Sequence, residues 1–126
     1  SAPFRFVNEC ELDATPTEVF AILADASEWP RWFPDFLSAK WLTPPPVGVG
    51  SERLAELKTV KAKEHFIVWE ESRRMAFRVQ EASLPLTNAM AEDYTLEEIP
   101  GGKTRLVWTV VYTPKLLVRA IHPILR

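Results

Sequence analysis

Hydrophobic and polar residues alternate along most of this chain, as is typical of half-buried β-strands. The clearest run is 74–81, where Met75, Phe77 and Val79 share one face. In all, the pattern predicts seven strands, at 4–12, 39–42, 53–59, 62–69, 74–81, 90–98 and 104–112. A Pro-Gly-Gly turn at 100–102 predicts a hairpin between the last two. So many strands require one large, strongly bent antiparallel sheet whose apolar face is covered.

Two helical segments interrupt this pattern between the first and second strands. Thr15 can cap a helix, Pro16 suits its first turn, and Glu18 completes a capping box. The first helix is expected to end near Asp25, and a second, shorter helix is predicted at 27–33. Both helices therefore lie between the first strand and the rest of the sheet.

The C-terminal segment carries a broad apolar stripe, with apolar pairs at 116–117, 120–121 and 124–125. This spacing predicts a final helix that packs on the open face of the sheet. Only twelve residues follow Pro114, and at 1.5 Å per residue they reach roughly 18 Å, which is short for seven strands. We therefore expect further residues past Arg126 or near Pro114. Because the chain begins with Ser1, we also expect processing or trimming at the N-terminus.

The composition is that of a single globular domain spanning residues 1–126, with 47% hydrophobic and 25% charged residues. A formal net charge of -2 argues against nucleic-acid binding, which needs a basic face. The sequence shows no apolar run long enough to be an integral membrane segment and no secretion signal. With one cysteine, Cys10, these features favour a reducing cytoplasm. A homodimer is possible.

The layout, together with four short segments, resembles a known family. The segments are DATPTEVF at 13–20, WPRWFP at 29–34, RRMAFR at 73–78 and GGKTRL at 101–106. They resemble the START-like (SRPBCC) superfamily, and within it the polyketide cyclase/dehydrase-like family, over the chain up to Thr113. The resemblance implies an α+β helix-grip fold: a seven-stranded curved antiparallel sheet around a C-terminal helix, with two short helices after strand 1. It says less about chemistry, because the superfamily hosts lipid carriers, cyclases, oxygenase domains and chaperone regulators.

A sheet too curved to be filled by one helix leaves space for an apolar ligand. Five Trp and seven Phe in so short a chain could line such a cavity. The candidate ligand-binding residues are Trp32, Phe36, His65, Met75, Phe77, Tyr94, Trp108 and Ile121. The same side chains could instead interdigitate in an ordinary core and leave no void.

Two of these candidates carry proton chemistry. His65 could orient a ligand carbonyl or act as a general acid or base, or it could simply face solvent beside Glu64. Tyr94 could place its hydroxyl in the cavity or bond to the backbone. Cys10 is interpreted as a small buried side chain. No nucleophile motif or metal-ligand spacing is present, so no catalytic residue is assigned beyond the candidates His65 and Tyr94, and no metal or cofactor is expected.

The hairpin around residues 58–61 is basic. Lys58, Lys61, Lys63 and Arg53 interleave with glutamates there, a pattern typical of a solvated face.

These features lead to three functional hypotheses. The first is binding of a small hydrophobic molecule, such as a lipid, polyketide or isoprenoid, between the sheet and the C-terminal helix. The alternative is a cyclase or dehydratase that holds a polyketide in a reactive fold while His65 or Tyr94 moves a proton. The third is a protein-interaction module that uses the segment 29–32 and the basic hairpin.

Overall fold

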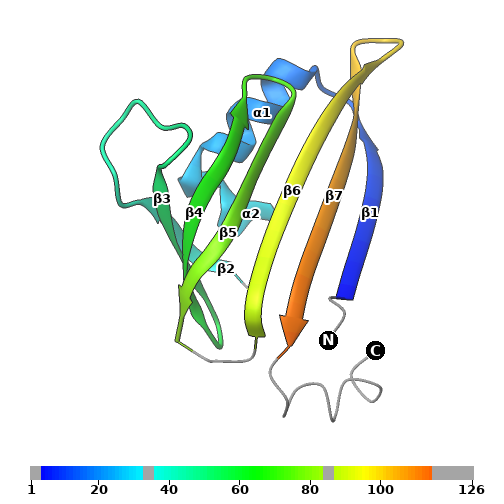
Figure 1. The fold of residues 1–126 in the computed structure, drawn as a ribbon. Coiled ribbons are helices and arrows are strands. Elements are labelled where there is room, and N and C mark those ends of the chain that lie inside the picture. The colour runs from blue at the N-terminus through cyan, green and yellow to red at the C-terminus, as the bar shows by residue number, and fades with distance from the viewer. Residues whose placement is uncertain (1–3, 33–35, 84–86, 115–126) are drawn as a thin grey trace.

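The protein forms one seven-stranded antiparallel sheet with short helices on one side (Figure 1). The computed structural model describes residues 4–32, 36–83 and 87–114. The strands are β1 (Phe4–Leu12), β2 (Phe36–Trp41), β3 (Glu52–Leu57), β4 (Lys61–Glu70), β5 (Arg74–Ala82), β6 (Thr87–Ile99) and β7 (Lys103–Pro114). They lie in the order β1-β7-β6-β5-β4-β3-β2, which confirms the predicted seven-stranded sheet.

Both predicted helical segments are present, and the second differs from the prediction in its type and its bounds. Helix α1 spans Pro16–Ala24, and the predicted second helix is a 3₁₀ turn, Ala26–Glu28, followed by α2, Trp29–Trp32. The expected C-terminal helix, with Ile121 on it, lies outside the described residues.

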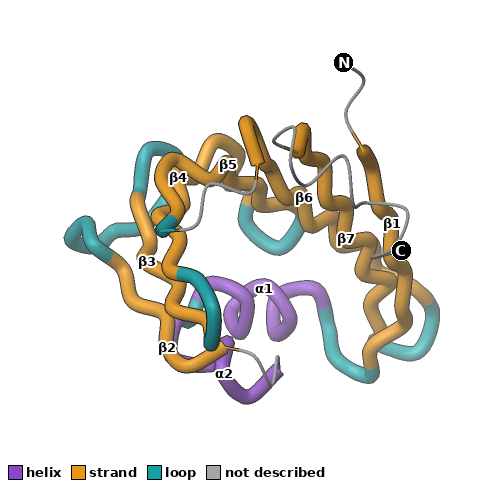
Figure 2. Tube along the Cα trace, turned by 90° about the horizontal axis from the view of Figure 1, so that it is seen from below, coloured by secondary structure: helices purple, strands orange, loops and turns teal. Residues whose placement is uncertain are grey.

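The sheet is bent into an arc, and both helices lie on its concave side (Figure 2). Two shifts of register interrupt the pairing of β4 with β5, one before Glu64 and one after Phe66. Such irregularities bend a strand and increase its twist. The curvature lets both ends of the sheet approach α1, which therefore roofs part of the concave face.

The start of α1 follows the predicted capping box. The Thr15 hydroxyl accepts a hydrogen bond from the Glu18 backbone N–H at 3.3 Å, and the Glu18 carboxylate accepts one from the Thr15 backbone N–H at 3.0 Å. These two bonds satisfy backbone N–H groups that a helix terminus leaves unpaired. The local sequence is therefore enough to set where α1 begins.

Aromatic side chains fill the part of the concave face between β2 and β5. Phe66 and Phe77 are fully buried, with ring centroids 5.2 Å apart. Trp41 packs on Phe66 at 5.0 Å, and Phe20 of α1 meets Trp69 edge-to-face at 5.2 Å. Contacts of this kind add to the stabilisation from burial. Aromatic rings in mutual contact thus occupy this half of the concave face.

One buried hydroxyl connects the far half of the sheet to the segment that precedes α1. Thr104, at the start of β7, is fully buried and donates a hydrogen bond of 2.7 Å to the carbonyl of Ala14. The two residues are 90 positions apart in the sequence. This bond holds the segment before α1 against the sheet.

Replacing Thr104 with valine tests this connection. The shape is kept but the Ala14 carbonyl loses its donor, so we expect Thr104→Val to lower the free energy of unfolding by about 1–2 kcal/mol. The measurement is urea denaturation monitored by tryptophan fluorescence. The matched control is Thr109→Val on the opposite face of β7, expected to change stability by less than about 0.5 kcal/mol. Equal effects of the two substitutions would contradict the proposed anchor.

Candidate functional site

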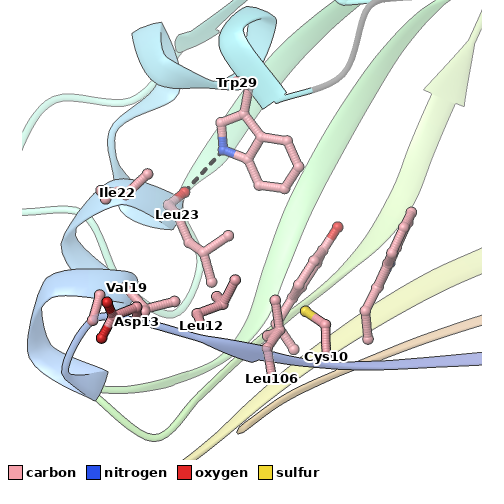
Figure 3. A pocket seen from close by; sticks show the side chains of 11 residues that line it. Cys10, Leu12, Asp13, Val19, Ile22, Leu23, Trp29 and Leu106 are labelled. Carbon is pink, nitrogen blue, oxygen red and sulfur yellow. Dashed lines mark hydrogen bonds between the residues drawn. The ribbon is translucent and has the colours of Figure 1, made fainter. Parts of the chain in front are cut away.

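A pocket of about 450 Å³ lies between α1 and the half of the sheet formed by β1, β7 and β6 (Figure 3). This volume falls within the range of cavities that hold small ligands. Its walls are almost entirely apolar, and Asp13 is the one charged residue among the described residues that line it. The lining residues are Cys10, Leu12, Asp13, Ala14, Val19, Ile22, Leu23, Trp29, Tyr94, Leu106 and Trp108.

The register of the strands explains why these side chains meet. Tyr94 of β6 lies opposite Trp108 of β7, and Cys10 of β1 lies opposite Leu106 of β7. Residues directly opposite each other in an antiparallel pair point to the same face. The Tyr94 and Trp108 rings are nearly parallel, at 8°, with centroids 5.9 Å apart. These two stacked rings lie on the sheet side of the pocket.

Trp29 forms part of the wall on the helix side. Its indole N–H donates to the Leu23 carbonyl at 2.9 Å, the bond drawn as a dashed line in Figure 3. Its ring meets Tyr94 edge-to-face, with centroids 5.8 Å apart. Burial of this large side chain, which is 3% exposed, fixes its position. The pocket is thus bounded by three aromatic residues from separate elements.

The polar ends of the Tyr94 and Trp108 side chains converge on one carboxylate. Tyr94 Oη donates to Glu92 Oε1 at 2.6 Å, and Trp108 Nε1 donates to the same atom at 2.9 Å. Burial raises the pKa of Glu92, although these two hydrogen bonds oppose that rise. Burial, followed by the nearby Glu92 charge, raises the pKa of Tyr94 well above its ordinary value. Tyr94 therefore keeps its proton and directs it to Glu92.

A buried charge pair also lies on the concave side of the sheet. Arg53 is fully buried, and its Nε donates to Glu64 Oε1 at 2.6 Å. Its guanidinium also lies against four aromatic rings. The distances from Cζ to the ring centroids are 4.6 Å for Trp29, 5.1 Å for Phe66, 5.3 Å for Phe77 and 5.7 Å for Trp41. Cation–π attraction of this kind strengthens when the charge is withdrawn from water.

This position of Arg53 corrects the expectation of a solvated basic hairpin. Arg53 and Ala55 of β3 point into the core, while Leu54 between them is only partly buried. Arg53, and not the apolar Leu54, points inward because of the strand register. Arg53 pairs with Glu64 on β4, and residues paired in this way share a face of the sheet. Lys58 and Lys61 are exposed, so the expectation holds for the tip of the hairpin.

Burial also changes the protonation of Glu64. Desolvation outweighs the attraction of Arg53 and raises the pKa of Glu64 to about 7. The charge of Glu92 contributes to this rise. With both carboxylates ionised, this cluster would carry one negative charge beyond what Arg53 compensates. Protonation of Glu64 near neutral pH therefore relieves an excess interior charge.

The candidate residues predicted from the sequence lie in different parts of the structure. Tyr94 and Trp108 line the pocket together. Met75 and Phe77 are buried in the packed half of the core, and Phe36 packs on Trp29 with centroids 5.6 Å apart. None of these last three lines the pocket. Ile121 and the side chain of Trp32 lie outside the described part.

His65 does not line the pocket. It alternates with Glu64 and Phe66, which point inward, so its side chain points to the opposite face of β4. Its Nδ1 lies 3.9 Å from Glu52 Oε2. Cys10, expected to be buried, is exposed and borders the pocket.

Two negative findings apply to residues 4–32, 36–83 and 87–114. No group of three or more His, Cys, Asp or Glu side chains is arranged there to hold a metal ion. No described helix is long and apolar enough to cross a membrane.

The raised pKa of Glu64 predicts that stability falls as pH rises. The folded protein keeps a proton on Glu64 up to pH 7, whereas the unfolded chain loses it near the ordinary value of 4.5. Between these values the folded state binds more protons, so the free energy of unfolding should drop by roughly 3 kcal/mol from pH 5 to pH 8. Urea denaturation at both pH values measures this drop.

A neutral side chain at position 64 tests whether Glu64 causes this fall in stability. Glu64→Gln should match the wild type at pH 5 and remove most of the decline toward pH 8. The control Glu97→Gln removes an exposed carboxylate from β6 and should leave the decline unchanged. A decline that persists in Glu64→Gln would show that Glu64 is not its source.

The chain matches known proteins over most of its length. The model of a family described as polyketide cyclase / dehydrase and lipid transport matches residues 3–126. An uncharacterized protein of Mycobacterium tuberculosis (strain H37Rv) is 42% identical over 111 residues, which make up 87% of this chain and 66% of that protein. The chain thus spans slightly less than two thirds of the length of this relative.

Two solved structures show the same fold. A START superfamily protein from Mycobacterium smegmatis is similar at a TM-score of 0.76 with 14% identity, over 89% of this chain and 78% of that chain. The ZhuI aromatase/cyclase from Streptomyces sp. R1128 is similar at a TM-score of 0.77 with 16% identity, over 90% of this chain and 69% of that chain. At such identities the similarity concerns the fold alone. The chain belongs to the polyketide cyclase / dehydrase and lipid transport family, whose model matches nearly its whole length.

Proposed function

We propose that this protein binds a small hydrophobic molecule in the pocket between α1 and the β1–β7–β6 half of the sheet. The observation that carries the proposal is the pocket itself, about 450 Å³ in volume, with walls that are nearly all apolar. Transfer of apolar ligand surface from water into such a pocket is favourable by about 25 cal/mol per Å². A lipid, polyketide or isoprenoid fits this description.

Shape and aromatic surface would provide the specificity. The stacked Tyr94 and Trp108 rings line the pocket, and the Trp29 ring meets Tyr94 edge-to-face beside them. Rigid aromatic side chains favour ring-bearing ligands because aromatic contacts add to simple burial. The description of the family includes lipid transport, which agrees with a binding role. A pocket of this kind supports ligand binding better than it supports a docking surface for another protein.

A second candidate is an enzyme of the cyclase or dehydratase kind. It is favoured by one observation, the Tyr94 hydroxyl at the pocket wall, hydrogen-bonded to the Glu92 carboxylate. Such a pair could move a proton to or from a bound polyketide. Turnover of a polyketide substrate by wild type that survives both Tyr94→Phe and His65→Gln would contradict proton transfer by these side chains.

A pocket-filling substitution tests the binding proposal. Cys10→Phe places a ring in the space bordered by β1, so we expect the affinity for the uncharged fluorescent probe N-phenyl-1-naphthylamine to fall by about tenfold or more. The control is Val7→Phe on the opposite face of the same strand, where Val7 is 54% exposed. It adds the same side chain and should leave the affinity unchanged. Equal binding by wild type and Cys10→Phe would place the probe outside this pocket.

A further inference from the structure

The two edge strands of the sheet differ in how they are protected from pairing with another chain. β2 forms one edge and β1 the other (Figure 1). β2 is six residues long, has a shift of register between Phe36 and Ser38, carries an exposed Lys40 and contacts both the 3₁₀ turn and α2. Short length, irregular pairing, lysine and a covering helix are common ways of protecting an edge strand.

β1 is built differently. It is nine residues long, contains no proline or lysine, and pairs with β7 in one continuous register. From Arg5 to Leu12, its backbone hydrogen bonds within the described part of the chain go only to β7. Phe6 and Val7 are exposed large hydrophobic residues on this strand. The backbone N–H and C=O groups on its outer side can therefore pair with a further strand.

The sequence of β1 complements itself when two copies of the strand run antiparallel. With Asn8 opposite Asn8 of the second copy, all nine residues of each strand have a partner. Arg5 then lies opposite Glu11 of the second copy, and Phe6 lies opposite Cys10. The side-chain amide of Asn8 has both donors and an acceptor, so it can bond to its own copy. Opposite charges and apolar side chains thus meet across the same pair of strands.

The charges on β1 are available for this pairing. Arg5 is exposed and has no ion pair among the described residues. Glu11 lies 3.9 Å from Arg105, which is closer to Glu9, at 3.2 Å. Glu11 can therefore take a second cation while Arg105 stays with Glu9. Opposite charges directly across an antiparallel pair stabilise it, and a two-fold axis forms each such contact twice.

From these features we infer that two copies of this chain associate through β1, antiparallel and centred on Asn8, with two Arg5–Glu11 ion pairs. The two sheets then form one continuous sheet, with both concave faces on the same side. Because Cys10 lines the pocket, Phe6 of the second copy borders the pocket on its β1 side. The inference goes beyond the proposed binding function and does not depend on which ligand is bound.

Sedimentation velocity of the wild-type chain measures this association over concentrations from about 1 μM to 1 mM. We expect the mass to rise with concentration from the 14.4 kDa of one chain toward twice that value.

Exchange of the two charges tests the interface and its register. Arg5→Glu places like charges opposite each other twice, so we expect the dissociation constant of the dimer to rise by about tenfold or more. Glu11→Arg should have the same effect, and the double variant should restore a constant close to that of the wild type. The matched control Lys40→Glu makes the same change of charge on β2 and should leave the dimer unchanged. Circular dichroism checks that each variant is folded.

Each part of the inference can fail separately. If the wild type stays at 14.4 kDa up to the highest concentration, no dimer forms and the inference is wrong. A dimer that persists in both folded single variants would place the interface elsewhere than on β1. Single variants that dissociate without recovery in the folded double variant would contradict the register centred on Asn8.

Discussion

The buried pair of Arg53 and Glu64 is the constraint on which the rest of the structure depends. If either side chain turned to solvent, the other would stay buried without its hydrogen-bond partner, at a cost of about 1–3 kcal/mol or more. The strands β3 and β4 must therefore stay in the register that places Arg53 opposite Glu64. A slip by one residue would turn both side chains to the other face of the sheet. The pair thus specifies which face of these strands points inward.

The same pair divides the concave face into two halves. Near β2 to β5, aromatic rings gather around the guanidinium and fill the space. Near β1, β7 and β6, smaller residues such as Cys10 and Leu106 leave a pocket. Trp29 stands at the boundary, since its ring lies against Arg53 and also lines the pocket. A buried arginine and an apolar pocket therefore lie close together in one small domain.

Two residues of the pocket, Tyr94 and Trp108, could be predicted because strand alternation and a tight hairpin place them on one face. Glu92 escaped prediction although it alternates with Tyr94 and shares its face. The reason is that a carboxylate on a strand is normally assigned to the solvent side. Arg53 was not predicted to be buried for the same reason. Both residues could have been found from a polar residue that lies on the same face of a strand as buried aromatic residues.

The sequence by itself determined the number of strands and their succession along the chain. It also determined the start of α1 at its capping box and the hairpin between β6 and β7. Each of these depends on residues a few positions apart, so periodicity and turn chemistry reveal them. Only the tertiary structure decided which charges are buried and where the pocket lies. Cys10 meets Leu106 only because β1 pairs with β7, and Thr104 meets Ala14 across 90 positions. Burial in this fold comes from such distant pairings, which no local pattern contains.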